Sequence, residues 1–261
     1  MWVVATFSAL CSSNRYKSLK PNSIMKKIFI ALSCVLLLAS CHMVLKPSVK
    51  RGEPVKISKK EVPVKAFEQV AIAGSFDVFY EQGDSATVRV EGPEDALEEV
   101  DIRIDGKTLY ISQKEHSGIF NIPKGLGEID VYITSADLIN VEIAGSGDFK
   151  SSKKIDTDRL SLSVAGSGEI ELADVICDGV KAEIAGSGDV SVHNLVTGDT
   201  KLSIAGSGDM DFHFSQGGKV SVEIAGSGDV KLSGKVTGTD FDIAGSGTID
   251  DKHLMVGGGE R

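Results

Sequence analysis

The sequence predicts an all-β protein, folded as a right-handed parallel β-helix with rungs of about 20 residues. The main observation is a phrase of the form Ile/Val-Ala-Gly-Ser-Gly that occurs six times, with spacings of 21, 20, 20, 20 and 19 residues between successive copies. The copies start at Ile143, Val164, Ile184, Ile204, Ile224 and Ile243. A period this regular is typical of one small unit stacked on itself, and the right hand follows the general preference of parallel crossovers.

The second observation is strict alternation of apolar and polar residues through each copy, as in Val141–Phe149. This pattern predicts strands that bury one face and expose the other. Both glycines of the phrase fall on the inward side, where they indicate a corner with no room for a side chain. The alternative is an antiparallel sandwich or barrel of 20-residue hairpins. The nearly constant repeat length favours the β-helix, because every rung must close at the same perimeter.

The half that precedes the repeats is predicted to be less regular. Residues 70–84 contain a degenerate copy of the phrase with Phe76 in place of the second glycine. A strand is expected over 86–92, and Pro93 followed by acidic residues predicts a short helical turn over 93–99. Asp105-Gly106 lies between two alternating runs in 101–113, which indicates a hairpin. Residues 114–127 are expected to form a loop, and 128–134 to form a strand that leads into the repeats.

The N-terminal region has the pattern of a secretion signal. Basic residues after Met25 precede an apolar run over 28–39 that is shorter than the ~20 residues a membrane span needs. Leu38-Ala39-Ser40-Cys41 resembles a bacterial lipobox, which implies that Cys41 carries lipid and begins the mature protein. The predicted organisation is an upstream extension (1–24), a lipoprotein signal peptide (25–40), a lipidated N-terminus and tether (41–61), a β-helix domain (62–256) and a tail (257–261).

Charge and cysteine content narrow the function. Residues 1–40 hold five basic and no acidic residues, so their removal takes the formal charge from −9 to −14. Such an acidic chain is unsuited to nucleic acid, which needs clustered Lys and Arg. After removal of the leader and lipidation of Cys41, Cys177 is the one remaining cysteine, so no intramolecular disulfide is expected. Cys177 is predicted to be a small, largely buried apolar side chain.

An acidic residue follows the phrase in one register and predicts an outward ladder beside a column of serines. The ladder consists of Asp148, Glu169, Asp189, Asp209 and Asp229. Neighbouring charges about 5 Å apart in water repel by about 0.8 kcal/mol, which the fold tolerates without a ligand. Ca²⁺ takes six to eight oxygens, so this ladder is expected to bind it weakly or not at all. The favoured interpretation is that each aspartate caps its own corner, and no other cofactor is expected.

Three further side chains are candidates for a weak metal site. His193 and His213 share a register on adjacent rungs, with Asp211 nearby. A transition-metal site normally needs at least three protein ligands with supporting contacts, so exposed surface histidines are the favoured interpretation.

The segment GSFDVFYEQGDSATVRVEGPEDALEEVDIRIDGKTLYIS resembles the start of the head GIN domain, a putative auto-transporter adhesin domain, and the IAGSGD series resembles its second half. The resemblance covers about 62–250. It implies a β-helix-like fold and a Bacteroidetes-type envelope lipoprotein. It also implies adhesion, and it supplies no catalytic residues.

These observations favour a non-enzymatic envelope lipoprotein that binds a glycan or a protein ligand. A polysaccharide lyase or hydrolase is the first alternative, but such enzymes need grooves, and only the loop at 114–127 is long enough to shape one. A self-associating scaffold, and hence a homo-oligomer, is the second alternative. The lipid on Cys41 is expected to hold the protein on the outer membrane. Because no acidic residue closely follows Cys41, the periplasmic face is favoured over the cell surface.

Overall fold

The computed structural model places Pro54–Arg261 in one compact unit, of which it describes residues 57–114 and 129–257. The expected upstream extension, the signal peptide and Cys41 lie outside the described residues, as does nearly all of the expected loop 114–127. In the described ranges, no helix is long and apolar enough to cross a membrane.

The described chain is almost entirely β-structure. Its elements are β1 (Ile57–Val62), β2 (Gln69–Gly74), β3 (Asp77–Gln82), β4 (Thr87–Pro93), α2 (Glu94–Leu97), β5 (Val100–Asp105), β6 (Thr108–Gln113), β7 (Asp130–Ser135), β8 (Asn140–Gly145), β9 (Asp148–Asp156), β10 (Arg159–Gly166), β11 (Glu169–Gly186), β12 (Asp189–Gly206), β13 (Asp209–Gly226), β14 (Asp229–Gly245) and β15 (Thr248–Val256). Within these ranges the strands form one continuous hydrogen-bonded sheet.

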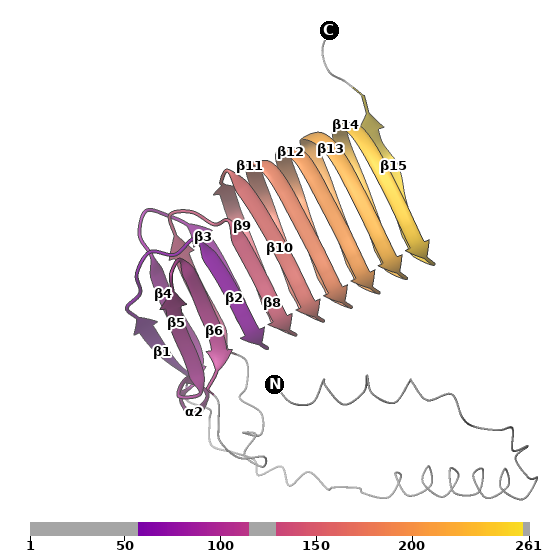
Figure 1. Ribbon diagram of the computed structural model, residues 1–261. Coiled ribbons are helices and arrows are strands. Elements are labelled where there is room, and N and C mark those ends of the chain that lie inside the picture. Colours follow the sequence, from indigo (N-terminus) through magenta and orange to yellow (C-terminus); the bar gives the residue numbers. More distant parts are fainter. Residues whose placement is uncertain (1–56, 115–128, 258–261) are drawn as a thin grey trace, which may run out of the picture. The chain divides into compact units, whose positions relative to one another are not determined.

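The predicted parallel stack is confirmed. Strands β11, β12, β13, β14 and β15 follow one another in parallel pairs, as the row of ribbons in Figure 1 shows. Equivalent positions of successive phrases pair directly, for example Ile184 with Ile204 and Gly186 with Gly206. The antiparallel sandwich or barrel is therefore wrong for the repeats, because the register joins neighbouring rungs side by side rather than as hairpins.

Each rung has two strand segments joined by a bend. In β11, residues 169–176 pair with β9 and residues 179–186 pair with β10. We call the segment that follows the glycine corner the first side of the rung, and the segment that leads to the next corner the second side. Both segments turn apolar side chains inward. Ile143, Val164, Ile184, Ile204 and Ile224 form one such buried column on the second side. A buried side chain of this size contributes about 1.5–3 kcal/mol.

The corner between rungs depends on the two glycines of the phrase. The amide of Ser207 donates to the carbonyl of Gly186 at 2.8 Å, and the same bond recurs up the stack. Gly206 has φ +141°, and a Cβ there would lie 2.1 Å from the Gly186 oxygen. A Cβ on the second glycine, Gly208, would lie 2.1 Å from the oxygen of Gly188 and 2.8 Å from Ile184. The predicted absence of room for a side chain is therefore confirmed at both positions.

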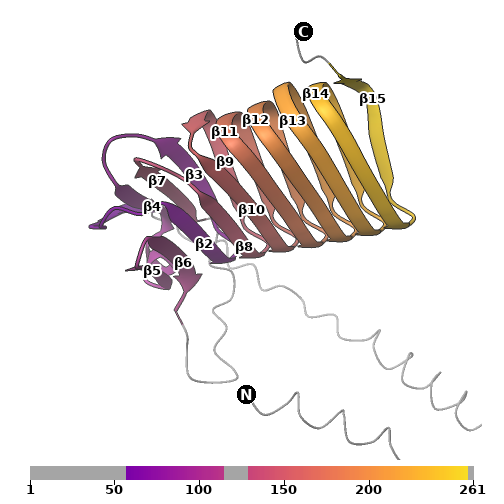
Figure 2. The same cartoon turned by 45° about the horizontal axis from the view of Figure 1, so that its top comes forward.

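The N-terminal end of the stack uses antiparallel strands, which are most easily followed in Figure 2. The predicted hairpin is confirmed as β5–β6, and β6 continues the second side by pairing in parallel with β2. On the first side, β4 pairs antiparallel with β7, and β1 pairs antiparallel with β4. The predicted helical turn is confirmed as α2, which buries Ala96 and Leu97. Strand β1 uses residues 57–61, expected in the tether, to pair with β4.

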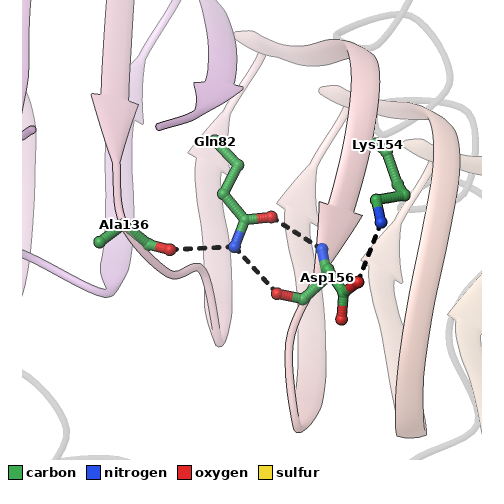
Figure 3. A network of polar contacts seen from close by, with 4 residues as sticks. All are labelled: Gln82, Ala136, Lys154 and Asp156. Atoms are coloured by element: carbon green, nitrogen blue, oxygen red, sulfur yellow. Dashed lines mark hydrogen bonds and ion pairs between the residues drawn. The ribbon is translucent and has the colours of Figure 1, made fainter. Parts of the chain in front are cut away.

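One glutamine joins this irregular end to the column. The Gln82 side-chain amide donates to the carbonyls of Ala136 and Asp156, both at 2.9 Å, and its oxygen accepts the Asp156 amide at 2.7 Å (Figure 3). Lys154 pairs with the Asp156 carboxylate at 3.0 Å. The Gln82 side chain thus supplies backbone-like hydrogen bonds where β3 ends.

A substitution at one corner tests the glycine requirement. Gly206→Ala is expected to lower the free energy of unfolding by about 3 kcal/mol or more, because the unfavourable φ and the overlap with Gly186 add together. Gly238→Ala is the matched control, since no atom lies within 4 Å of its added Cβ, and it should change stability by less than about 1 kcal/mol. Urea unfolding of both variants measures this; similar losses in the two would contradict the corner argument.

Candidate functional site

The outward residues of the first side form aligned columns across β7, β3, β9 and the first segments of β11 to β14. The acidic ladder is one of these columns. The register pairs Asp148 with Glu169, Glu169 with Asp189, and Asp189 with Asp209. The structure extends it by two members that sequence reasoning missed, because Asp130 pairs with Asp77 and Asp77 with Asp148. The degenerate phrase before Asp77 was the available signal.

The ladder carboxylates from Asp189 to Asp229, toward the β15 end, form hydrogen bonds between rungs. Oδ1 of Asp189 accepts the amide of Asp209 at 3.1 Å, and Oδ1 of Asp209 accepts the amide of Asp229 at 3.0 Å. Oδ1 of Asp229 accepts both the amide and the hydroxyl of Thr248, at 2.9 and 2.6 Å. The expectation that each aspartate caps its own corner is wrong in this detail. The carboxylate caps the next rung, because the parallel register places the next amide directly beside it.

Nearer the N-terminal end of the stack, Lys150 forms ion pairs with two ladder carboxylates. Lys150 Nζ lies 3.2 Å from Asp148 Oδ2 and 3.3 Å from Glu169 Oε2. Partial burial lowers the pKa of Lys150, but its hydrogen bonds to these two carboxylates outweigh that effect and raise the pKa above its ordinary value. The lysine therefore stays charged. A weak calcium site on the ladder stays a prediction, and among the described residues no three His, Cys, Asp or Glu side chains gather in a way that could hold a metal.

The structure does not bring the suggested histidine site together. His193 Nε2 lies 3.0 Å from Glu171 Oε1 on the rung before, whereas His213 Nδ1 lies 2.9 Å from Ser233 Oγ on the rung after. Asp211 pairs with Lys231 at 2.7 Å. Each side chain thus has a separate partner on the exposed surface.

A groove of about 1200 Å³ lies over this face at the N-terminal end of the stack. Five of its lining side chains follow one register line across neighbouring strands, and His193 contacts the last of them, Glu171. We call these six side chains the groove row. They are Arg89, Tyr132, Phe79, Lys150, Glu171 and His193. Residues 61–64, at and after the end of β1, form part of the wall. The groove exists because antiparallel β4 and β1 extend the first side beyond the regular rungs.

Aromatic rings form the centre of the groove row. The rings of Tyr132 and Phe79 stack with centroids 5.1 Å apart and an interplanar angle of 20°. The Arg89 guanidinium lies 4.5 Å from the Tyr132 centroid, on a neighbouring strand. Both rings are only partly buried. Partial burial, followed by the charges of Asp130 and Glu91, raises the pKa of Tyr132 above its ordinary value, so its phenol stays neutral.

The ionic groups of the groove row are paired. Arg89 Nε lies 3.0 Å from Glu91, Lys150 lies between two carboxylates, and Glu171 contacts His193. This arrangement offers ring surface beside fixed hydrogen-bonding groups, a combination suited to orienting a polar ligand. The groove is not apparent from the sequence, because side chains on neighbouring strands form it rather than a long loop. The outward position of Phe79 between Asp77 and Glu81 was the available signal.

A second hollow, of about 660 Å³, lies at the bend between the two sides and includes Cys177. The Cys177 side chain is buried and its Sγ lies 3.5 Å from Thr197 Oγ1. The prediction of a largely buried cysteine is confirmed. Burial raises the pKa of this thiol, which therefore stays protonated and poorly nucleophilic.

Comparison with known proteins agrees with this architecture. The family model described as "Putative auto-transporter adhesin, head GIN domain" matches residues 66–197 and 189–258. No curated protein matches the chain.

Solved structures from Bacteroides and Parabacteroides species share the fold. A putative adhesin from Bacteroides fragilis is 20% identical with a TM-score of 0.59, covering 77% of this chain and 97% of its own. A putative adhesin from Parabacteroides merdae is 19% identical with a TM-score of 0.59, covering 75% and 95%. A putative lipid binding protein from Parabacteroides distasonis is 22% identical with a TM-score of 0.53, covering 74% and 96%. At these identities the likeness establishes the fold alone.

Two substitutions at one ladder position separate capping from charge. Asp209→Ala removes the acceptor for the Asp229 amide and is expected to lower the free energy of unfolding by about 1 kcal/mol. Asp209→Asn keeps a carbonyl oxygen at that place and removes one like charge, so it should stay within about 0.5 kcal/mol of the parent. Thermal unfolding of both compares them. Equal losses would show that charge, rather than the cap, matters at this position.

Proposed function

We propose that this chain, which belongs to the family described as "Putative auto-transporter adhesin, head GIN domain", is a non-enzymatic cell-envelope lipoprotein that binds a glycan in the groove over its first side. The observation that carries the proposal is the groove row. It combines a partly exposed aromatic stack with ionic side chains that are already paired.

The aromatic part of the row suits the apolar faces and edges of a sugar ring. Phe79 has Tyr132 on one face, and Lys150 follows on the neighbouring strand on its other side. Aromatic rings supply contact area at little cost in side-chain entropy, and the surrounding polar groups orient the ligand. Arg89, Lys150 and Glu171 are within the same groove and offer hydrogen bonds to hydroxyl groups.

The pairing of charges favours binding over catalysis. A glycoside hydrolase uses two carboxyl groups on either side of the scissile bond, each free to exchange a proton or attack. In the groove, Glu171 is held by His193 and the cation of Lys150 is held by Asp148 and Glu169. These contacts stabilise a fixed surface. A polysaccharide-active enzyme is the alternative, and the first experiment below distinguishes it from a binding protein.

The family supports a location in the cell envelope, and we propose lipid anchoring to the periplasmic face of the outer membrane. The family description names an adhesin, which acts at the envelope. The signal-like segment before Cys41 and its lipobox-like ending support lipidation of that cysteine and anchoring to the outer membrane. No acidic residue closely follows Cys41, which supports a position on the periplasmic face of the outer membrane.

Glycan binding is tested with a soluble form that starts at residue 42 and so contains the whole unit Pro54–Arg261. On a glycan array that includes uronate polymers, with matrix proteins in parallel, we expect binding to a glycan. Tyr132→Ala should weaken that binding by about tenfold or more, because it removes both the stack and the Arg89 contact.

Tyr110→Ala is the matched control, since Tyr110 also carries an arginine, Arg103 at 5.1 Å, but lies outside the groove. It should bind like the parent. Binding that survives Tyr132→Ala, or binding to matrix proteins alone, would contradict the groove proposal. Turnover of any polymer on the array would contradict the non-enzymatic assignment.

Lipidation is tested separately in cells of a Bacteroidetes host. Labelling with an alkyne-tagged fatty acid should mark the parent and leave Cys41→Ser unmarked, and the variant should leave the membrane fraction. Cys177→Ser is the control and should be labelled like the parent, because that thiol is buried. Protease treatment of intact cells should spare the periplasmic protein; its loss there would place it on the cell surface.

A further inference from the structure

The last rung leaves Ile243 exposed, and Phe241 and Ile249 only half-buried, at positions that every preceding rung buries. Phe241 pairs with the buried Val222, Ile243 with Ile224, and Ile249 with Val230. Ile243 is 41% exposed, compared with 2% for Ile224 in the same column. Of the five large apolar side chains exposed in the described chain, Ile243, Met255 and Val256 belong to this rung. The apolar column therefore reaches the surface at the β15 end.

This end also presents an unpaired strand edge. In the described ranges β15 pairs only with β14. An edge of this kind is a template for another strand. The opposite end of the stack is closed differently. There β1–β4, β5–β6 and α2 cover the column, and Phe67, Leu97 and Leu109 are buried. Among the described strands, β1 and β5 also have an unpaired edge at that end, but the apolar column beside them is covered. The matching apolar surface of a second copy is therefore its own β15 end.

The charges on β15 are self-complementary in one antiparallel register. The pairing of β15 with β14 is irregular at Asp251–Lys252, so Asp250 and His253 both face outward while Ile249 and Leu254 both face the column. A two-fold axis through the Asp251–Lys252 peptide places Asp251 opposite Lys252, Asp250 opposite His253, and Ile249 opposite Leu254. Shifting the register by two residues in one direction places Asp250 against Asp251, and shifting it in the other places Lys252 against His253. Lys252 is available for this pairing, because it contacts Asp250 of its own strand only at 3.4 Å and is 80% exposed.

The strand edge on the second side of the last rung is less suited to pairing with a second copy. Its edge carries Asp240 and Asp242, and an antiparallel copy of that edge would place acidic side chains near one another. Asp240 is also held by Lys219 at 2.9 Å. The charges thus favour β15 as the edge that pairs.

We propose that the β15 end binds a second copy of this chain, through antiparallel β15–β15 pairing about a two-fold axis at Asp251–Lys252. The first side then continues as one sheet across both copies, and Ile249 of each copy packs against Leu254 of the other. Because the interface uses the same surface from both copies, the assembly closes at two and does not grow into a filament. This inference does not depend on glycan binding in the groove, which lies at the other end of the stack.

Sedimentation of the soluble form from residue 42 should show a concentration-dependent dimer. Asp251→Lys and Lys252→Asp should each raise the dissociation constant by about tenfold or more, because each places like charges opposite one another. The double variant Asp251→Lys/Lys252→Asp restores opposite charges and should return the constant to near the parent value. Lys153→Asp, which changes charge equally on exposed β9, is the control and should leave the constant unchanged.

A second measurement does not depend on the strength of the dimer. A mixture of Asp251→Cys and Lys252→Cys proteins should form mixed disulfides faster than either protein alone, because the register sets those two positions opposite each other. Equal unfolding temperatures of the charge variants, measured at a concentration where all are monomeric, would show that they fold alike. A monomer at every concentration, a filament, or a dimer that ignores the charge variants would each overturn the proposal.

Discussion

Contact between backbones at the glycine corner is the constraint on which the rest of the structure depends. The carbonyl of one corner glycine accepts the amide of the serine in the next rung, and the glycine above lies so close that a Cβ would overlap that carbonyl. Only glycine has both the required φ and the required lack of a side chain. With the corner held at the same place in each rung, the perimeter stays near 20 residues and equivalent residues stack. The buried apolar columns, the serine column and the acidic ladder are consequences of that stacking.

Stacking also explains why like charges can form a column without a ligand. From Asp189 to Asp229, each aspartate accepts a hydrogen bond from a backbone amide of the next rung. This hydrogen bond offsets the repulsion between the charges and also holds the corner. Nearer the N-terminal end, Lys150 bridges the carboxylates of Asp148 and Glu169 instead. A repeated surface of this kind presents largely the same groups in each rung. Distinct chemistry is therefore found where the repeat is interrupted.

The two ends interrupt the repeat in different ways. At the N-terminal end, antiparallel strands continue the first side with Arg89 and Tyr132, which join Phe79 in the groove. Degeneracy of the first phrase is part of the same change, because Phe76 is buried where later rungs have glycine. At the other end β15 is the last described strand, where Ile243 is exposed and β15 pairs only with β14 among the described strands. The groove thus suits a ligand, whereas the β15 edge suits another β-strand.

The sequence by itself determined the parallel stack, the rung length, the facing of the strands and the hairpin at Asp105-Gly106, because these depend on local periodicity and turn chemistry. It also placed the acidic ladder on the outer surface. Only the tertiary structure decided that the aspartates cap the next rung, that residues 57–61 pair with β4, and that His193 and His213 contact different partners. The groove belongs to this second group, since Arg89, Tyr132 and Phe79 come from strands whose pairing order differs from their order in the chain. Periodicity reports which face a residue occupies, but a site made by pairing distant strands depends on which strands become neighbours.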